Sequence, residues 1–141
     1  MKNFFKNYSL YLAWTTSLLA VIGSLYFSNV RNFPQCVLCW YQRICMYPQI
    51  LILGAGIILK DKKIAFYSMP LALVGWLISV YHNLLYYKII PENLAPCVTG
   101  VSCTTKFIEY FGFVTIPLLS FLAFTIIIIF VMIYQKLNRY E

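Results

Sequence analysis

The sequence predicts an all-α integral membrane protein whose four helices cross the bilayer as one bundle. Of its 141 residues, 62% are hydrophobic and only 11% are charged, which leaves too few polar side chains to cover a water-soluble globule. A helix that crosses about 30 Å of hydrocarbon needs roughly 20 residues. Four stretches of about this length contain few or no charges. They predict one domain over residues 1–141, embedded in a lipid bilayer.

The four helices are expected at residues 8–28, 40–59, 64–87 and 113–134. The first follows Lys2 and Lys6, as the apolar part of a signal peptide would. It is too long for a signal peptide and lacks a small-x-small cleavage site, so we expect a retained helix. The turn 60–63 is very short, which makes the second and third helices antiparallel neighbours.

The basic residues predict the orientation of the bundle. Those of the termini and the 60–63 turn are Lys2, Lys6, Lys60, Lys62, Lys63, Lys136 and Arg139, and those of the other two loops are Arg31, Lys88 and Lys106. The positive-inside rule then places both termini in the cytoplasm and two loops, 29–39 and 88–109, outside the cell membrane. The net charge of +7 is scattered over segment ends, which argues against a nucleic-acid-binding patch.

Four of the five cysteines fall in these two outer loops, where disulfides persist. Cys36 and Cys39 form a C-x-x-C pair in the first loop, and Cys97 and Cys103 form a second pair in the other. A C-x-x-C spacing commonly lowers the pKa of a thiol. Taken alone, such a pair can bind metal, staple a loop or exchange electrons. Cys45 lies about 120° around the helix from Cys39 among apolar neighbours, which predicts inert packing.

Arg43 carries the only cation within an expected span, and it makes redox chemistry the favoured role of the first pair. An arginine at mid-bilayer costs about 2.5 to 3.5 kcal/mol on insertion scales, so it indicates a functional site. It lies about 6 Å below Cys39 along the helix. From there it can favour a Cys39 thiolate and donate hydrogen bonds to a quinone carbonyl. The alternative is an arginine that reaches out to lipid phosphates.

His82, the only histidine, belongs to a polar stripe on the third helix, at about the depth of Arg43. The stripe has i, i+3, i+4, i+7 spacing and consists of Ser79, His82, Asn83 and Tyr86. Such a stripe should face the bundle interior. His82 is therefore either a hydrogen-bonding residue between helices or a contact of a cofactor.

Together these features resemble the DsbB family of disulfide bond formation proteins, most closely its short BdbC branch. The resemblance covers nearly the whole chain and rests on the four spans, the run Cys36-Val37-Leu38-Cys39-Trp40-Tyr41-Gln42-Arg43 and the second pair after Pro96. The second pair is more compact than in the longer DsbB proteins, which leaves open whether a rearranged Cys36–Cys103 disulfide forms.

The resemblance implies a quinone-dependent protein thiol-disulfide oxidoreductase, with quinone (ubiquinone or menaquinone) as its cofactor and no metal. Its partner would be a secreted DsbA- or BdbD-like thiol oxidase with a thioredoxin fold. Cys97 would form the mixed disulfide with this partner, and Cys103 would complete the pair. Electrons would pass to Cys36 and Cys39, and from Cys39 to the quinone beside Arg43. We expect Gln42 and His82 to complete the quinone site.

Two other functions remain open at this point. The four outer cysteines can form two inert disulfides or an all-thiolate metal site in a structural or transport subunit. The net flow of electrons can also be reversed, as in quinone or vitamin K epoxide reductase relatives with a similar bundle. The Gln42-Arg43 pair fits the DsbB type better.

Overall fold

A computed structural model of the chain describes residues 2–32, 34–95, 102 and 115–140. Its long helices are α1 (Lys2–Leu25), α2 (Val37–Leu59), α3 (Ile64–Tyr86) and α4 (Ile116–Arg139). A π-helical turn, η1 (Tyr26–Val30), prolongs α1, and a short 3-10 turn, η2 (Glu92–Leu94), follows α3. Four helices of the described ranges are long and apolar enough to cross a membrane.

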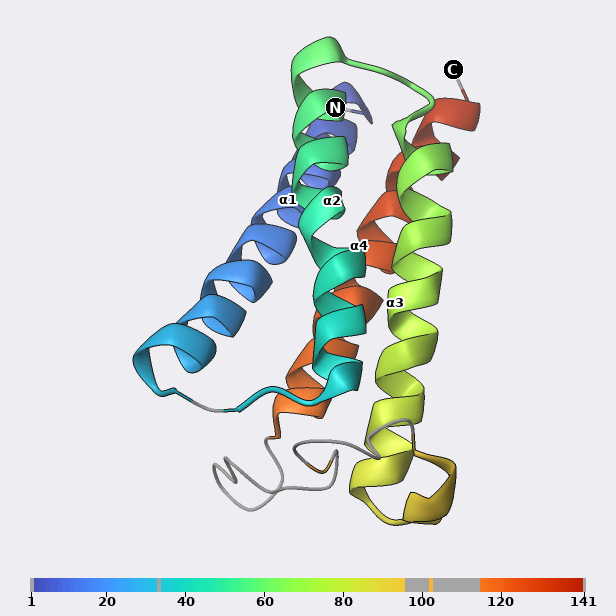
Figure 1. The fold of residues 1–141 in the computed structure, drawn as a ribbon. Helices are drawn as coiled ribbons and strands as arrows, with labels where there is room; N and C mark the ends of the chain where they lie inside the picture. Colours follow the sequence, from blue (N-terminus) through green and yellow to red (C-terminus); the bar gives the residue numbers. More distant parts are fainter. Residues whose placement is uncertain (1, 33, 96–101, 103–114, 141) are drawn as a thin grey trace.

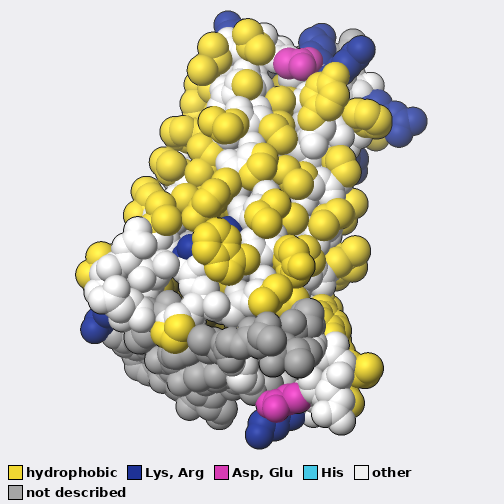
Figure 2. Space-filling model, viewed as in Figure 1, with side chains coloured by type: hydrophobic (Ala, Val, Ile, Leu, Met, Phe, Trp, Pro, Cys, Tyr) yellow, Lys and Arg dark blue, Asp and Glu magenta, His cyan; other side chains and the backbone are white. Residues whose placement is uncertain are grey.

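The helices form a ring in which each packs on its neighbour in the sequence and α4 closes against α1. Figure 1 shows both chain termini at the end of the bundle where the α2–α3 turn lies. Hydrophobic side chains cover the length of the visible face, and most of its Lys and Arg side chains lie near the two ends (Figure 2). This distribution matches an apolar belt that contacts lipid and charged ends that contact water.

Three helix starts differ from the sequence prediction, and α1, α3 and α4 end at residues 25, 86 and 139 rather than at 28, 87 and 134. α1 begins at Lys2 rather than at residue 8, and α2 begins at Val37 rather than at residue 40. Both helices begin earlier because residues 2–7 and 37–39 include no glycine or proline that would interrupt a helix. α4 begins at Ile116 rather than at residue 113, because Thr115 has an extended backbone and its side chain caps the helix. Thr115 Oγ1 accepts a hydrogen bond of 3.3 Å from the backbone N–H of Leu118.

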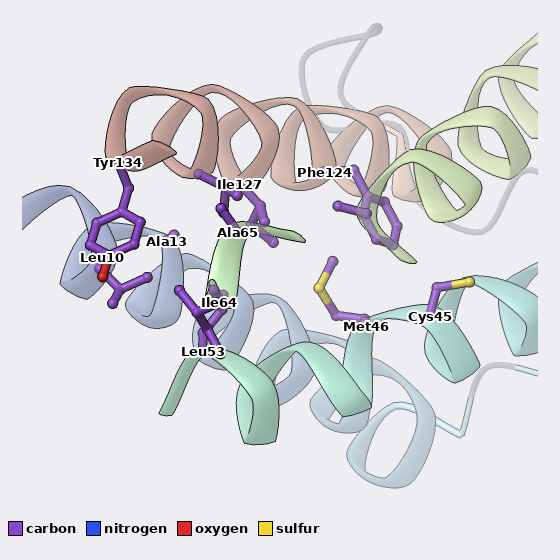
Figure 3. Packing of buried hydrophobic residues seen from close by; sticks show 12 residues of the cluster. Leu10, Ala13, Cys45, Met46, Leu53, Ile64, Ala65, Phe124, Ile127 and Tyr134 are labelled. Atoms are coloured by element: carbon purple, nitrogen blue, oxygen red, sulfur yellow. The ribbon is translucent and has the colours of Figure 1, made fainter. Parts of the chain in front are cut away.

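Buried hydrophobic residues of all four long helices form one cluster along the bundle. The cluster includes Leu10 of α1, Leu53 of α2 and Tyr134 of α4, which Figure 3 shows together. Cys45 belongs to the same cluster, as expected. Farther along, Gly75 of α3 meets the ring of Phe124 so closely that a Cβ atom at this glycine would lie 2.3 Å from it. A small residue here lets α3 and α4 approach each other.

Some polar side chains inside the bundle are paired with partners on neighbouring helices. Ser68 Oγ of α3 donates to Gln49 Oε1 of α2 at 2.6 Å, and Gln49 Nε2 donates to the Ser68 carbonyl at 2.9 Å. Trp14 Nε1 of α1 donates to the carbonyl of Ile50 at 3.2 Å. Because hydrocarbon supplies no hydrogen-bonding partners, such bonds fix which faces of the helices meet.

Candidate functional site

The C-x-x-C pair lies at the N-terminus of α2. Cys36 is the N-cap residue, with an extended backbone (φ −77°, ψ 164°), and Cys39 lies in the first helical turn. Their Sγ atoms are 3.1 Å apart and share a hydrogen bond. Cys36 is buried, whereas Cys39 is partly exposed. The earlier start of α2 therefore brings both sulfurs to one helix end, within a small displacement of the bond length of a disulfide.

The surroundings of Cys36 stabilise its thiolate. The hydrogen bond with Cys39, followed by the hydrogen bond with His82, holds the pKa of Cys36 well below the usual range of a thiol, although burial acts in the opposite direction. The N-terminus of a helix also favours negative charge through its free N–H groups. A thiolate is the nucleophilic form of cysteine, so Cys36 is prepared for disulfide exchange.

His82 and Gln42, which the sequence assigns to a quinone site, form a chain that ends on Cys36. His82 is 2% exposed and Gln42 is 6% exposed. His82 Nε2 lies 3.7 Å from Cys36 Sγ, and His82 Nδ1 lies 3.3 Å from Gln42 Nε2. The imidazole thus joins α3 to both the N-cap and the second turn of α2. His82 therefore both contacts the Cys36 sulfur and links the two helices.

Arg43 points into the bundle rather than out to lipid phosphates. It is 8% exposed, and its guanidinium donates from Nε to Ser24 Oγ at 2.8 Å and from Nη2 to the Ser24 carbonyl at 2.7 Å. The guanidinium carbon also lies 5.7 Å from the ring centroid of Trp40, within reach of a cation–π interaction. The charge is thus held at a fixed place between α2 and the end of α1.

Ser24 is a site residue that sequence reasoning missed. A lone serine in an apolar helix usually bonds its own backbone, so no spacing in the sequence points to Arg43. The usable signal is positional: Ser24 lies near the outer end of its span, at the depth expected of Arg43. The π-helical turn η1 follows at once, and such turns are frequent at functional sites.

A cavity of about 600 Å³ opens beside these groups. Figure 1 shows α1 leaning away from the other helices toward its η1 end, where the cavity lies. The polar groups described above share the lining with apolar side chains of η1 and α4: Cys36, Cys39, Gln42, Arg43, His82, Ser24, Phe27 and Phe124. Apolar walls with a few convergent polar groups are typical of sites for small organic ligands of this volume.

The three reactive side chains can also be compared with a metal site. The ligand atoms of Cys36, Cys39 and His82 all lie within 4.8 Å of one another. In the part of the chain that the structure describes, no further His, Cys, Asp or Glu joins this group. Two thiolates and an imidazole can hold a zinc ion with one position open, so the trio has the composition for metal binding when it is reduced.

The second cysteine pair, Cys97 and Cys103, lies outside the described residues. The described residue between them, Ser102, lines the same cavity as the first pair.

Comparison with known proteins decides the family. The model of a family described as "Disulfide bond formation protein DsbB" matches residues 6–134. The chain belongs to the DsbB family. The resemblance found in the sequence is thereby confirmed, and membership implies thiol oxidation in disulfide bond formation by a multi-pass membrane protein with a thiol-oxidase partner.

Individual DsbB-family relatives match over most of their length. The chain is 47% identical over 121 residues to "Disulfide bond formation protein C" of Bacillus subtilis, which covers 86% of this chain and 88% of the relative. It is 46% identical over 134 residues to "Probable disulfide formation protein C 1" of Bacillus anthracis, covering 93% and 96%. A "Probable disulfide formation protein" of Coxiella burnetii is 43% identical over 137 residues, covering 95% and 92%. No solved structure matches the chain.

Proposed function

We propose that the chain is a thiol:quinone oxidoreductase that reoxidises an extracytoplasmic thiol oxidase with a thioredoxin fold and passes the electrons to ubiquinone or menaquinone. One observation carries the proposal: the Cys36–Cys39 pair and the Arg43 guanidinium line one apolar cavity inside the bundle. A quinone dissolves in the bilayer, whereas a thiol oxidase is in water, so this chemistry needs a cysteine pair that is accessible from the membrane.

The residues that line the cavity have different roles in the proposed reduction of quinone. Cys39, the partly exposed sulfur, faces the acceptor, while Cys36 closes the disulfide behind it. Two of the donor groups of Arg43 are bound to Ser24. In the described ranges Nη1 has no acceptor, so it can donate to a quinone carbonyl as negative charge develops there. The net reaction converts two thiols and a quinone into a disulfide and a quinol, with two electrons and two protons transferred.

The second pair, Cys97 and Cys103, receives electrons from the partner in this proposal, as the family resemblance implies. The proposed orientation has both termini in the cytoplasm, with Lys60, Lys62 and Lys63 at the same side. The cysteine loops then lie outside the cell membrane, where a secreted partner can reach them.

The test is an assay with purified protein, a reduced thioredoxin-fold partner and a soluble quinone, in which loss of quinone absorbance is followed. Cys97→Ser should abolish exchange with the partner while the reduced Cys36–Cys39 pair still reduces quinone in a single turnover. Cys39→Ser should abolish both single and repeated turnover of quinone. Unchanged turnover in either variant would falsify the assignment.

A metal-binding function is the competing candidate, because the trio of Cys36, Cys39 and His82 has a ligand spacing that suits zinc. The two functions differ in metal content. We expect protein purified under reducing conditions to contain far less than one zinc or copper ion per chain. A stoichiometric ion that is lost in His82→Leu would favour the metal function instead.

A further inference from the structure

We propose that Gln42 and His82 form a buried hydrogen-bonded relay that holds Cys36 as a thiolate, so that His82 acts on this sulfur rather than on the quinone. The inference rests on the proposed function, since it treats Cys36 as a reacting sulfur. His82 contacts the reacting atom, and Gln42 is a positioning residue that acts through His82.

The order of atoms in the relay determines where the imidazole proton lies. Gln42 Nε2 is an amide N–H group and can only donate, so the His82 Nδ1 atom that it faces at 3.3 Å accepts. A neutral imidazole that accepts at Nδ1 carries its proton on Nε2. Nε2 is the atom that faces Cys36 Sγ at 3.7 Å, so it donates toward the sulfur.

Cys36 Sγ thus receives donors from two helices. The Cys39 thiol of α2 lies 3.1 Å away and His82 Nε2 of α3 lies 3.7 Å away. The sequence alone favours a thiolate at Cys39, but these contacts converge on Cys36. Cys36, Gln42 and His82 are each at most 6% exposed, so few water molecules can reach the atoms of the relay. Because water cannot replace a lost donor there, each donor contributes more than it would at the surface.

The relay has a defined place in the redox step. The Cys36 thiolate forms the S–S bond with Cys39 Sγ as the S–H bond of Cys39 breaks, and the two electrons pass to a quinone in the cavity. One proton of the quinol comes from the Cys39 thiol, and the other replaces the proton that Cys36 gave up beforehand. His82 keeps its own Nε2 proton throughout and lowers the free energy of the charged sulfur before the bond forms.

Among the residues that the structure describes, the other ionisable groups around the sulfurs come from the same two helices. Arg43 and Tyr47 of α2 and His82 and Tyr86 of α3 line the cavity with Cys36 and Cys39. The lining residues described on α1 and α4 contain no ionisable side chain. A change in the titration of Cys36 on removal of His82 therefore reports the relay and not an acid or base of α1 or α4.

The test measures the pH dependence of Cys36 alkylation in the reduced full-length protein, with mass spectrometry identifying the modified cysteine. The midpoint of the profile reports the thiolate, because limited access to the buried sulfur scales the rate equally at every pH. We expect His82→Leu to raise the midpoint by about one pH unit, a tenfold loss of thiolate below it. Gln42→Leu should raise it less, and the double variant should match His82→Leu alone.

Two further variants distinguish loss of the relay from a general loss of helix packing. His82→Gln places an amide N–H near the position of Nε2 and should restore part of the shift. Gln49→Leu removes another buried glutamine of α2, one bonded to Ser68 instead, and should leave the midpoint unchanged.

An unchanged midpoint in His82→Leu, an equal shift in Gln49→Leu, or additive shifts in the double variant would each overturn the relay. The measurement contains neither quinone nor partner. Its outcome is therefore independent of the assay that tests the proposed function.

Discussion

The middle of the helix bundle and its η1 end use buried polar side chains in opposite ways. In the middle of the bundle, Gln49 of α2 and Ser68 of α3 bond each other through two hydrogen bonds. At the η1 end the helices diverge around a cavity, and the polar groups converge on two sulfurs and one guanidinium. The first arrangement stabilises the fold, and the second leaves donors available for a ligand.

The largest expected effect comes from replacing Cys39, which lines the cavity at the η1 end. Cys39→Ser removes the sulfur that faces the cavity and forms the disulfide with Cys36, so quinone-coupled thiol oxidation should fall by about 10³-fold or more, the scale expected for loss of a covalent catalyst. The matched control is Cys45→Ala, a cysteine of the same helix that lies in the packed cluster. Its turnover should stay within about twofold of the unchanged protein. A comparable loss of turnover in both variants would show that the η1 end has no special role in the reaction.

Arg43→Ala should weaken quinone binding by about 10- to 100-fold, because a charge-assisted hydrogen bond contributes about 1.5 to 3 kcal/mol. The KM for quinone and the KM for the reduced partner should be measured in the same preparation. The partner value should change little, since Arg43 is 8% exposed and lies within the bundle. Equal losses in both would indicate that Arg43 supports folding rather than the acceptor site.

Gly75→Val tests the packed region. The added side chain meets the Phe124 ring of α4, and overpacking of this kind typically costs about 1 to 3 kcal/mol of unfolding free energy. Thermal unfolding in detergent should show a lower Tm. Gly23→Val is the control, because a Cβ at Gly23 meets nothing within 4 Å. If Gly23→Val were as destabilising as Gly75→Val, the close approach of α3 and α4 would not be the cause.

The smallest expected effect is that of Ser24→Ala. It removes the hydroxyl that accepts from Arg43 Nε but keeps the backbone carbonyl that accepts from Nη2. One lost hydrogen bond of about 1 kcal/mol corresponds to roughly a fivefold rise in the KM for quinone. Combined with Arg43→Ala, it should add nothing further. An additive effect would show that Ser24 acts on the ligand independently of Arg43.

Particular residues show which structural features can be predicted from the sequence and which cannot. Apolar length alone predicted four long helices, and the structure confirms them. The start of α2 was wrong by three residues, because apolar periodicity does not mark where a helix begins and residues 37–39 contain no glycine or proline. Arg43 was recognised from its cost in hydrocarbon, but its partner Ser24 lies 19 residues away, and no local pattern connects the two.

The sequence by itself determined the membrane class, the number of long helices and the cysteine chemistry of the family, because these follow from composition, length and short-range spacing. Only the tertiary structure decided which sulfur the imidazole faces and where the guanidinium points. It also decided that a cavity opens beside them. These features depend on how α1, α3 and α4 are placed around α2, and the contacts that fix this placement join residues far apart in the chain. The C-x-x-C motif identifies the pair proposed to react, and the packing around it makes Cys36 and Cys39 unequal.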